Sequence, residues 1–347
     1  METLRPLVVR VAALGDTILL TAMLRALAEY WQRPCDVVVH AAWADSVLVG
    51  LDSVGEVVGL TSRAAPYWLC PSQQRLVGWL RHREPGPTYV IDKRDTVLRL
   101  LHRGRVPREW LVTSFQVPWR QRQHHLDHLL EVARHTPAAC PGPPGLFPDP
   151  APTPEIRVSE TEVAACRSWL GQKGWRGAPL VAVQTQSRRA NRGSWPGRRW
   201  ETAIRSIAAD LGDPTIALIG APHEAAAVQR IADRCRDLPV VNLAGELPVP
   251  RLFALLSICH SCVSLDTGPA HAAAAVGCPL VVLIRHTHPD EYRPVGPKDR
   301  IAQVCALPRN RLPQTQREFA RVHRTEDIEP EQVVAAWRRV TRPSSHR

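Results

Sequence analysis

Residues 266–271, with the sequence Asp-Thr-Gly-Pro-Ala-His, carry the residue types of a phosphate-binding loop. They stand between the segment Ser-Cys-Val-Ser-Leu at 261–265 and an alanine-rich segment that ends at Gly277. This order predicts a strand, a tight loop and a short helix. Pro269 suits the first helical turn, and amide groups without helical partners at a helix N-terminus attract anions. The loop is therefore a candidate site for a phosphate-bearing ligand at the carboxyl end of a parallel sheet.

Asp16 is a second residue that could do chemistry. It follows a predicted strand, 7–11, and a turn at 12–15. A carboxylate at such a strand-to-helix turn can take the proton of an attacking hydroxyl group. The competing interpretation is an N-cap for a helix over 17–31, and it is favoured when the residue is considered alone. Gly15 beside it is either an open approach for an acceptor or a turn residue.

These residues require a parallel sheet to bring them into place. The N-terminal half opens with strand, helix and strand (7–11, 17–31 and 35–39), with a further strand near 89–92. The second half alternates more clearly. Its predicted strands are 180–184, 215–219, 240–243, 261–265 and 279–284, and its predicted helices are 198–211, 223–236, 249–259 and 330–340. Such alternation predicts α/β domains with doubly wound parallel sheets.

The chain is expected to form two Rossmann-like domains. Its 347 residues suit two domains of ordinary size, and the proline-rich segment 137–154 is typical of a semi-rigid linker. We place the domains at 1–150 and 151–347, facing a central cleft. The later strands of the second domain and the end of the first strand would then face that cleft, with Asp16 opposite the 266–271 loop.

The charge balance favours anionic partners. Lys and Arg number 44 against 33 Asp and Glu, for a net charge of +11, and nearly all of the cations are arginines. Nucleotides, acidic glycans or an anionic membrane surface would suit this charge. Nucleic acid is not expected, because the arginines are scattered and no recognised binding motif is present. No segment is long enough to span a membrane and the N-terminus is not a signal peptide. We expect a cytoplasmic protein with peripheral contact to the inner membrane face.

Metal and disulfide chemistry are not expected. The nine cysteines are irregularly spaced, which is not typical of a disulfide framework. Cys259 and Cys262 have CxxC spacing without a second pair, and small residues entering a strand are the favoured interpretation. His124 and His128 are four residues apart, but only Asp127 stands near them as a further ligand. A surface helix is favoured there.

Four motifs that follow one another in order carry a resemblance to a known family. The segment 9–21 (VRVAALGDTILLT) is followed in order by Trp195-Pro196 with Trp200, by Gly-Ala-Pro-His-Glu at 220–224, and by 266–271. This ordered set, which covers most of the chain, resembles glycosyltransferase family 9, the ADP-heptose:lipopolysaccharide heptosyltransferases. The resemblance implies a GT-B fold with the acceptor on the first domain and a nucleotide-sugar on the second. It also implies inversion at the anomeric carbon without a required metal.

The resemblance implies roles for individual residues. Asp16 matches the catalytic base, and Gly15 lies on the acceptor side. Asp266 would contact the donor sugar rather than only close an Asx turn, and Glu224 would bind the ribose rather than only complement a helix dipole. His271 would contact phosphate or fill the helix–sheet interface. The complete donor set is Thr185, Ser187, Arg188, Arg189, Arg192, Glu224, Glu246, Leu247, Asp266, Thr267, Gly268 and His271, in which Glu246 and Leu247 would line an adenine pocket and Thr267 and Gly268 would stabilise the leaving diphosphate.

Two positions depart from the family pattern. Gly193 stands where the family carries a lysine that contacts the pyrophosphate. We hypothesise that Arg188, Arg189 or Arg192 replaces it; the alternative is a solvated basic loop. The segment Arg-His-Thr-His-Pro at 285–289 stands where the family often has Gly-Pro-Thr-Asp-Pro. Its bulky groups would reshape the donor-sugar site.

The expected function is transfer of a sugar, foremost a heptose from ADP-heptose, to a saccharide or lipid-linked saccharide acceptor, as in lipopolysaccharide core assembly. The nucleotide-sugar is a co-substrate, and no other cofactor is expected. One alternative is the same fold with another nucleotide-sugar and a small-molecule acceptor. A second is a non-catalytic nucleotide-binding homologue, against which the presence of Asp16 argues.

Overall fold

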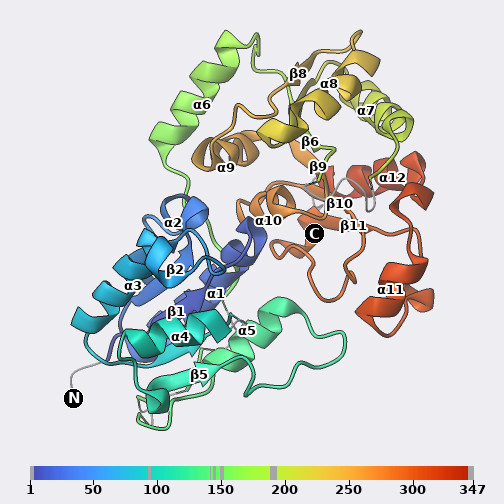
Figure 1. The fold of residues 1–347 in the computed structure, drawn as a ribbon. Coiled ribbons are helices and arrows are strands. Elements are labelled where there is room, and N and C mark those ends of the chain that lie inside the picture. Colours follow the sequence, from blue (N-terminus) through green and yellow to red (C-terminus); the bar gives the residue numbers. More distant parts are fainter. Residues whose placement is uncertain are drawn as a thin grey trace. The chain divides into compact units, whose positions relative to one another are not determined.

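The chain folds into two compact units, Met1–Arg157 and Val158–Arg347, in a computed structural model (Figure 1). The structure describes residues 4–92, 95–140, 142–143, 146–148, 152–187 and 194–342. Each unit contains one parallel sheet. No described helix is long and apolar enough to cross a membrane.

The first unit extends seven residues past the expected boundary at 150, to residue 157. The reason is that the end of the linker is bound to this unit. The Glu155 backbone N–H donates to Thr21 Oγ1 over 2.9 Å, and the Arg157 guanidinium pairs with the Asp52 carboxylate. The described residues of the proline-rich segment contain no helix or strand.

The sheet of the first unit has the strand order β3-β2-β1-β4-β5. The chain runs outward from β1 to β3 and then returns to β4 on the other side of β1. The carboxyl ends of β1 and β4 therefore form a topological switch point, where α/β sheets bind ligands. The elements are β1 (Leu7–Arg10), α1 (Leu14–Trp31), β2 (Cys35–His40), α2 (Ala41–Val47), β3 (Val54–Leu60), η1 (Tyr67–Leu69), α3 (Pro71–His82), β4 (Thr88–Val90), α4 (Asp95–Arg103), η2 (Arg108–Trp110), β5 (Leu111–Thr113) and α5 (His125–Ala133).

Burial on both faces explains the apolar character of β1. Leu7, Val8 and Val9 are fully buried, as expected for a central parallel strand covered by helices. The following helix begins earlier than expected, at Leu14, and its N-cap Ala13 has no side chain that could cap it. A helix start without a capping side chain leaves no clear signal in the sequence.

The sheet of the second unit has the strand order β11-β10-β9-β6-β7-β8. Here the chain runs from β6 out to β8 and returns to β9 on the other side of β6, so the switch point lies between β6 and β9. The elements are α6 (Glu160–Gln172), β6 (Leu180–Gln184), α7 (Gly197–Leu211), β7 (Thr215–Ile219), η3 (Pro222–Glu224), α8 (Ala225–Arg234), β8 (Val240–Asn242), α9 (Val249–Ile258), β9 (Ser261–Leu265), α10 (Gly268–Ala275), β10 (Leu280–Leu283), η4 (Lys298–Arg300), β11 (Ile301–Val304), η5 (Arg309–Arg311), α11 (Gln316–Val322), η6 (Thr325–Asp327) and α12 (Pro330–Thr341).

Tryptophans organise the core of the second unit. The Trp195 and Trp200 rings meet edge to face with centroids 4.8 Å apart, and Trp195 Nε1 donates to the Ile328 carbonyl over 2.8 Å. Trp337 of α12 is buried and its Nε1 donates to Ser261 Oγ of β9 over 2.9 Å. The motif tryptophans therefore pack the core beside the sheet that positions the 266–271 loop.

The end of α10 has the hydrogen bonds of a Schellman motif. Gly277 has a φ of +75°, a value that glycine adopts at little cost. The Cys278 N–H donates to the Ala273 carbonyl over 2.9 Å, and the Gly277 N–H to that of Ala274 over 3.1 Å. The expected strand–loop–helix–strand unit is thus present, and the α/β fold with two Rossmann-like units is confirmed.

Candidate functional sites

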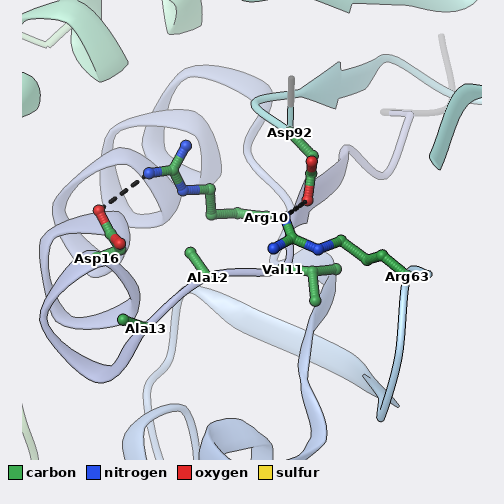
Figure 2. A pocket seen from close by; sticks show the side chains of 7 residues that line it. All are labelled: Arg10, Val11, Ala12, Ala13, Asp16, Arg63 and Asp92. Atoms are coloured by element: carbon green, nitrogen blue, oxygen red, sulfur yellow. Dashed lines mark hydrogen bonds and ion pairs between the residues drawn. The ribbon is translucent and has the colours of Figure 1, made fainter. Parts of the chain in front are cut away.

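A pocket of about 300 Å³ opens at the switch point of the first sheet (Figure 2). Arg10 is the last residue of β1, and Asp16 lies in the first turn of α1. Asp92 follows the end of β4, and Arg63 follows β3. The lining residues are Arg10, Val11, Ala12, Ala13, Asp16, Arg63 and Asp92. Two carboxylates and two guanidinium groups thus face one small pocket, which suits a ligand rich in hydroxyl groups.

Asp16 is directed at Arg10 rather than at the end of its own helix. Its Oδ1 accepts a hydrogen bond from Arg10 Nη2 over 3.0 Å, and its side chain is 27% exposed. Arg10 Nη1 donates to the Ile91 carbonyl over 3.2 Å, which fixes the guanidinium. The N-cap interpretation of Asp16 is wrong, because the helix begins two residues before it. Gly15 is buried in the same helical turn.

His125, at the start of α5, completes this group. Its Nε2 accepts from Arg10 Nη2 over 2.9 Å and lies 3.5 Å from Asp16 Oδ1. Burial, followed by the repulsion of the Arg10 cation, lowers the pKa of His125 to about 3, and the Asp16 carboxylate works against this fall. The ring is therefore neutral at pH 7, and because Nε2 accepts, Nδ1 carries the hydrogen. The Trp119 ring stacks on it at a centroid distance of 5.6 Å.

The expectation of a surface helix around the histidines is wrong. His124, His125 and His128 are all buried, because α5 packs against α1. His128 Nε2 donates to the Val117 carbonyl over 3.2 Å. Within the part of the chain that the structure describes, no group of three or more His, Cys, Asp or Glu residues could hold a metal ion.

The second carboxylate of the pocket is more enclosed. Asp92 is 3% exposed, and its Oδ2 pairs with Arg63 Nη1 over 2.6 Å. The sequence interpretation missed this pair and the role of Arg10. The available signals were a charged residue at the end of an apolar strand and an aspartate directly after Tyr89-Val90-Ile91.

In the second unit, Gln184 joins the loops at the switch point. Its Oε1 accepts from Thr267 Oγ1 over 3.1 Å and from Ser264 Oγ over 3.2 Å. This ties the end of β6, where Thr185 is fully buried, to the loop after β9. The Thr267 hydroxyl thus has a protein acceptor already, and it would have to turn in order to donate to a phosphate.

The first turn of α10 offers fewer amides than expected. The Ala270 N–H donates to the Thr267 carbonyl over 3.1 Å, and Pro269 has no N–H. Across the described residues, the amides of Thr267 and Gly268 donate to no protein acceptor. These two adjacent groups are the ones that could receive an anion. His271, one turn further along, is 8% exposed.

Asp266 lies beside the buried cation Arg285. Burial raises the pKa of the Asp266 carboxyl to about 6, and the Arg285 cation and a hydrogen bond with Thr287 work against this rise. Arg285 is 5% exposed, and its Nη1 donates to Ser187 Oγ. Arg285, in the 285–289 segment that differs from the family pattern, therefore connects the ends of β6 and β10 and lies beside the Asp266 carboxylate.

The histidine at position 288 of that segment has a structural role. Its Nε2 donates to the Pro313 carbonyl over 3.1 Å, and its Nδ1 accepts from the Asp290 N–H over 3.2 Å. It is fully buried and meets the Phe319 ring edge to face. His288 thus anchors the segment to α11.

Glu224 lies in a short 3₁₀ turn, η3, that precedes α8. Its Oε2 accepts from the Ala221 N–H over 2.8 Å, and the residue is 9% exposed. The Gly245 N–H donates to the Gly220 carbonyl over 2.9 Å, which joins the loops after β7 and β8. Glu224 is thereby brought to the loop that carries Glu246 and Leu247. The Glu246 carboxylate pairs with Lys173 Nζ and is 41% exposed, and Leu247 is half-buried.

The chain matches the family model described as "Glycosyltransferase family 9 (heptosyltransferase)" over residues 96–321. The protein belongs to glycosyltransferase family 9. This family 9 protein is similar in fold to a glycosyl transferase family 9 structure from Veillonella parvula, with a TM-score of 0.80, 15% identity and 98% of each chain covered. It is also similar to the ADP-heptose lps heptosyltransferase II of E. coli, with a TM-score of 0.73, 17% identity, and 97% of this chain and 98% of that chain covered.

Sequence similarity to curated relatives is more local. The family 9 protein is 30% identical to lipopolysaccharide heptosyltransferase 3 of Escherichia coli over 118 residues, 34% of each chain. It is 26% identical to lipopolysaccharide heptosyltransferase 2 of Salmonella typhimurium over 159 residues, 46% of this chain and 45% of the relative. The chain thus spans about a third to a half of the length of these two relatives.

The family 9 protein holds its expected site residues in two groups. Asp16 and Gly15 lie at the switch point of the first sheet, and those donor residues that the structure describes, between Thr185 and His271, follow the carboxyl ends of strands in the second. Arg188, Arg189 and Arg192, with Gly193, lie outside the described residues. Their proposed exchange for the family lysine stays a prediction.

Proposed function

We propose that this family 9 protein is an inverting glycosyltransferase that moves a heptose from ADP-heptose to a hydroxyl group of a saccharide, in lipopolysaccharide core assembly. The observation that carries the proposal is the placement of Asp16. Its carboxylate is held by Arg10 at a switch point, is partly exposed to a pocket, and has no capping role that would explain it.

Asp16 would act as the general base. The acceptor oxygen attacks the anomeric carbon of the donor while its proton passes to the Asp16 carboxylate, and the bond from that carbon to the diphosphate oxygen breaks. A single displacement of this kind inverts the anomeric centre. Neutral His125 and the carbonyl of Ile91 hold Arg10 in place, so that the carboxylate is oriented before the acceptor arrives.

The second unit would hold the donor. Negative charge develops on the departing diphosphate, and amide groups that are already in position stabilise such charge. The Thr267 and Gly268 amides would supply this contact, and arginines of the loop 188–192 would add to it. Glu224 would accept hydrogen bonds from the ribose hydroxyls through the oxygen that does not bind Ala221.

The ADP-heptose assignment draws on a solved relative. The E. coli heptosyltransferase WaaC, whose structure holds ADP-2-deoxy-2-fluoro heptose, is 18% identical to this chain with a TM-score of 0.57, over 91% of this chain and 98% of that chain. The acceptor would be a saccharide or a lipid-linked saccharide. We further propose peripheral contact with an anionic membrane, supported by the net charge of +11 and by the adjacent Trp68 and Leu69 side chains, which are 73% and 60% exposed.

Asp16→Asn tests the proposal, because it keeps the shape of the side chain and removes the base. We expect kcat to fall by about 10²- to 10⁴-fold, with thermal unfolding close to that of the wild type. Asp127→Asn is the matched control, since Asp127 is exposed on α5 in the same unit and outside the pocket. Near-normal turnover by a folded Asp16→Asn protein would show that the assigned base is wrong.

The donor is tested separately with a panel of nucleotide-sugars and mass spectrometry of the product. We expect the mass of a heptose to be added only when ADP-heptose is supplied. Transfer of another sugar would favour the small-molecule or other-glycan alternative. Nucleotide binding without transfer to any acceptor of a broad panel would favour a non-catalytic homologue.

A further inference from the structure

A second cavity, of about 610 Å³, lies in the second unit away from the predicted donor residues. It is open to solvent and is lined by residues of the segment 289–298, β11, the segment 305–312 and Arg339 of α12. β11 is the edge strand of its sheet, and β10 and β9 stand between it and β6. No described donor residue is among those that line it.

The cavity carries a surplus of positive charge. Arg293, Lys298, Arg309 and Arg339 line it, against one carboxylate, Asp290, for a formal charge of +3 (four minus one). Within the described ranges, Lys298, Arg309 and Arg339 form no ion pair with a carboxylate. Cations gathered around one hollow repel one another, and a bound anion relieves that repulsion.

The walls that carry these cations are held by hydrogen bonds. Lys298 opens η4, whose Arg300 N–H donates to the Pro297 carbonyl over 3.1 Å. Arg309 opens η5, which is closed by a bond of 2.9 Å from the Arg311 N–H to the Pro308 carbonyl. Gln303 Nε2 donates to the Pro289 carbonyl over 3.2 Å and so ties the 289–298 segment to β11.

The remaining lining is largely apolar. Val295, Ile301, Leu307 and Leu312 are among the residues that line the cavity. Small-molecule sites commonly have this volume and combine apolar walls with a few polar groups that orient the ligand. A ligand that suits the cavity therefore joins an anionic group to a carbon body.

We propose that this cavity binds a phosphate ester, with the phosphate received by Arg309, Arg339 and Lys298 and the carbon body against the apolar wall. Guanidinium groups recognise phosphate oxygens through paired hydrogen bonds, and an ammonium group adds a compact charge. The phosphate ester could be a soluble metabolite or the headgroup of a phospholipid. The chemistry recognised is the same in both cases.

The test compares two double variants that lose the same charge. Arg309→Gln with Arg339→Gln removes two cations from the cavity. Arg317→Gln with Arg321→Gln removes two exposed cations of α11, in the same unit but outside the cavity. Calorimetric titration with inorganic phosphate should show a Kd at least about tenfold higher in the cavity variant and within about twofold of wild type in the control.

Equal weakening in both double variants would show that only the overall charge matters and would overturn the proposal, as would undetectable phosphate binding by the wild type. Both variants keep the predicted donor residues, so a difference between them arises from the cavity. The readout needs neither donor nor acceptor, so it stands or fails independently of the proposed glycosyl transfer.

Two further ligands distinguish the sources of the phosphate. Glycerol 3-phosphate represents a soluble ester and dihexanoyl phosphatidic acid a lipid. Binding of both that is lost in the cavity variant supports the proposal. Tighter binding of the lipid then identifies a phospholipid headgroup as the ligand class, and equal or weaker binding identifies a soluble ester.

Discussion

Replacing Asp266 by Asn should change how the stability of the second unit depends on pH. Burial raises the pKa of this carboxyl from 3.8 to about 6. The folded form then binds a proton more tightly than the unfolded form does. Its contribution to stability is fully present below pH 3.8 and is lost as the pH rises through 6. At 1.36 kcal/mol per pKa unit, and with allowance for the partial exposure of the residue, the loss amounts to about 2–3 kcal/mol by pH 7.

The assay is denaturant unfolding of wild type and Asp266→Asn between pH 4 and pH 7.5. The asparagine variant has no proton to lose, so its free energy of unfolding should gain about 2–3 kcal/mol relative to wild type across this range. Asp210→Asn is a control of opposite sign. A hydrogen bond from Arg338 lowers the pKa of Asp210, so the stability that Asp210 contributes is present above its unfolded pKa and lost at more acid pH.

The reasoning would be refuted by a difference between wild type and Asp266→Asn that stays constant from pH 4 to pH 7.5. A constant difference would mean that Asp266 titrates alike in the folded and unfolded chains. In that case the Arg285 cation and the Thr287 hydrogen bond would offset the whole effect of burial. The loop carboxylate would then be fully ionised at pH 6, as an exposed aspartate is.

Two other variants separate binding from folding. Glu224→Gln keeps an oxygen that can accept from the Ala221 N–H, so the free energy of unfolding should change by less than about 0.5 kcal/mol. The donor KM should rise by about tenfold, because the ribose hydroxyls lose a charged acceptor. An unchanged KM would argue against the ribose role. Trp68→Ser combined with Leu69→Ser should lower co-sedimentation with phosphatidylglycerol vesicles by about fivefold or more at unchanged stability, because both side chains lie at the surface. Equal sedimentation would place any membrane contact elsewhere.

The strand–loop–helix–strand unit around 266–271 was predictable because every local signal agrees. Fully buried strands flank it, Pro269 lies near the helix start, and Gly277 ends the helix in the left-handed conformation. An element is predictable from the sequence when its local preferences agree with the tertiary structure in this way. The alternation of strands and helices in the second unit was predictable for the same reason.

Other features depend on contacts that the local sequence pattern does not reveal. Nothing near His125 in the sequence reveals that Trp119 stacks on it or that Arg10, 115 residues away, donates to it. A histidine-rich amphipathic segment is therefore read as a surface helix until its neighbours are known. The start of α1 could not be predicted from the sequence, because the N-cap residue Ala13 has no side chain that accepts a capping hydrogen bond.

The candidate site was predictable in part for a related reason. Asp16 and the donor loops lie in the family motifs, whereas Arg63 and Asp92, which line the same pocket as Asp16, lie outside them. Arg63 and Asp92 are 29 residues apart and meet only because β3 and β4 both end at the same edge of the sheet. From the sequence, Arg285 was expected to reshape the donor-sugar site. In the structure its buried guanidinium donates to Ser187 and lies beside the Asp266 carboxylate.

The packing of α12 has a consequence for synthesis of the chain on the ribosome. Val333, Val340 and Trp337 of this helix belong to the same buried cluster as Val263 of β9 and other sheet residues. A nascent chain that has reached residue 329 has all six strands of the second sheet but leaves the apolar surface beneath α12 open to water. The second unit can therefore complete its core only after the last described helix, α12, has emerged. The first unit has its described elements by Ala133, the end of α5, and itself ends at Arg157, some 180 residues before the end of α12.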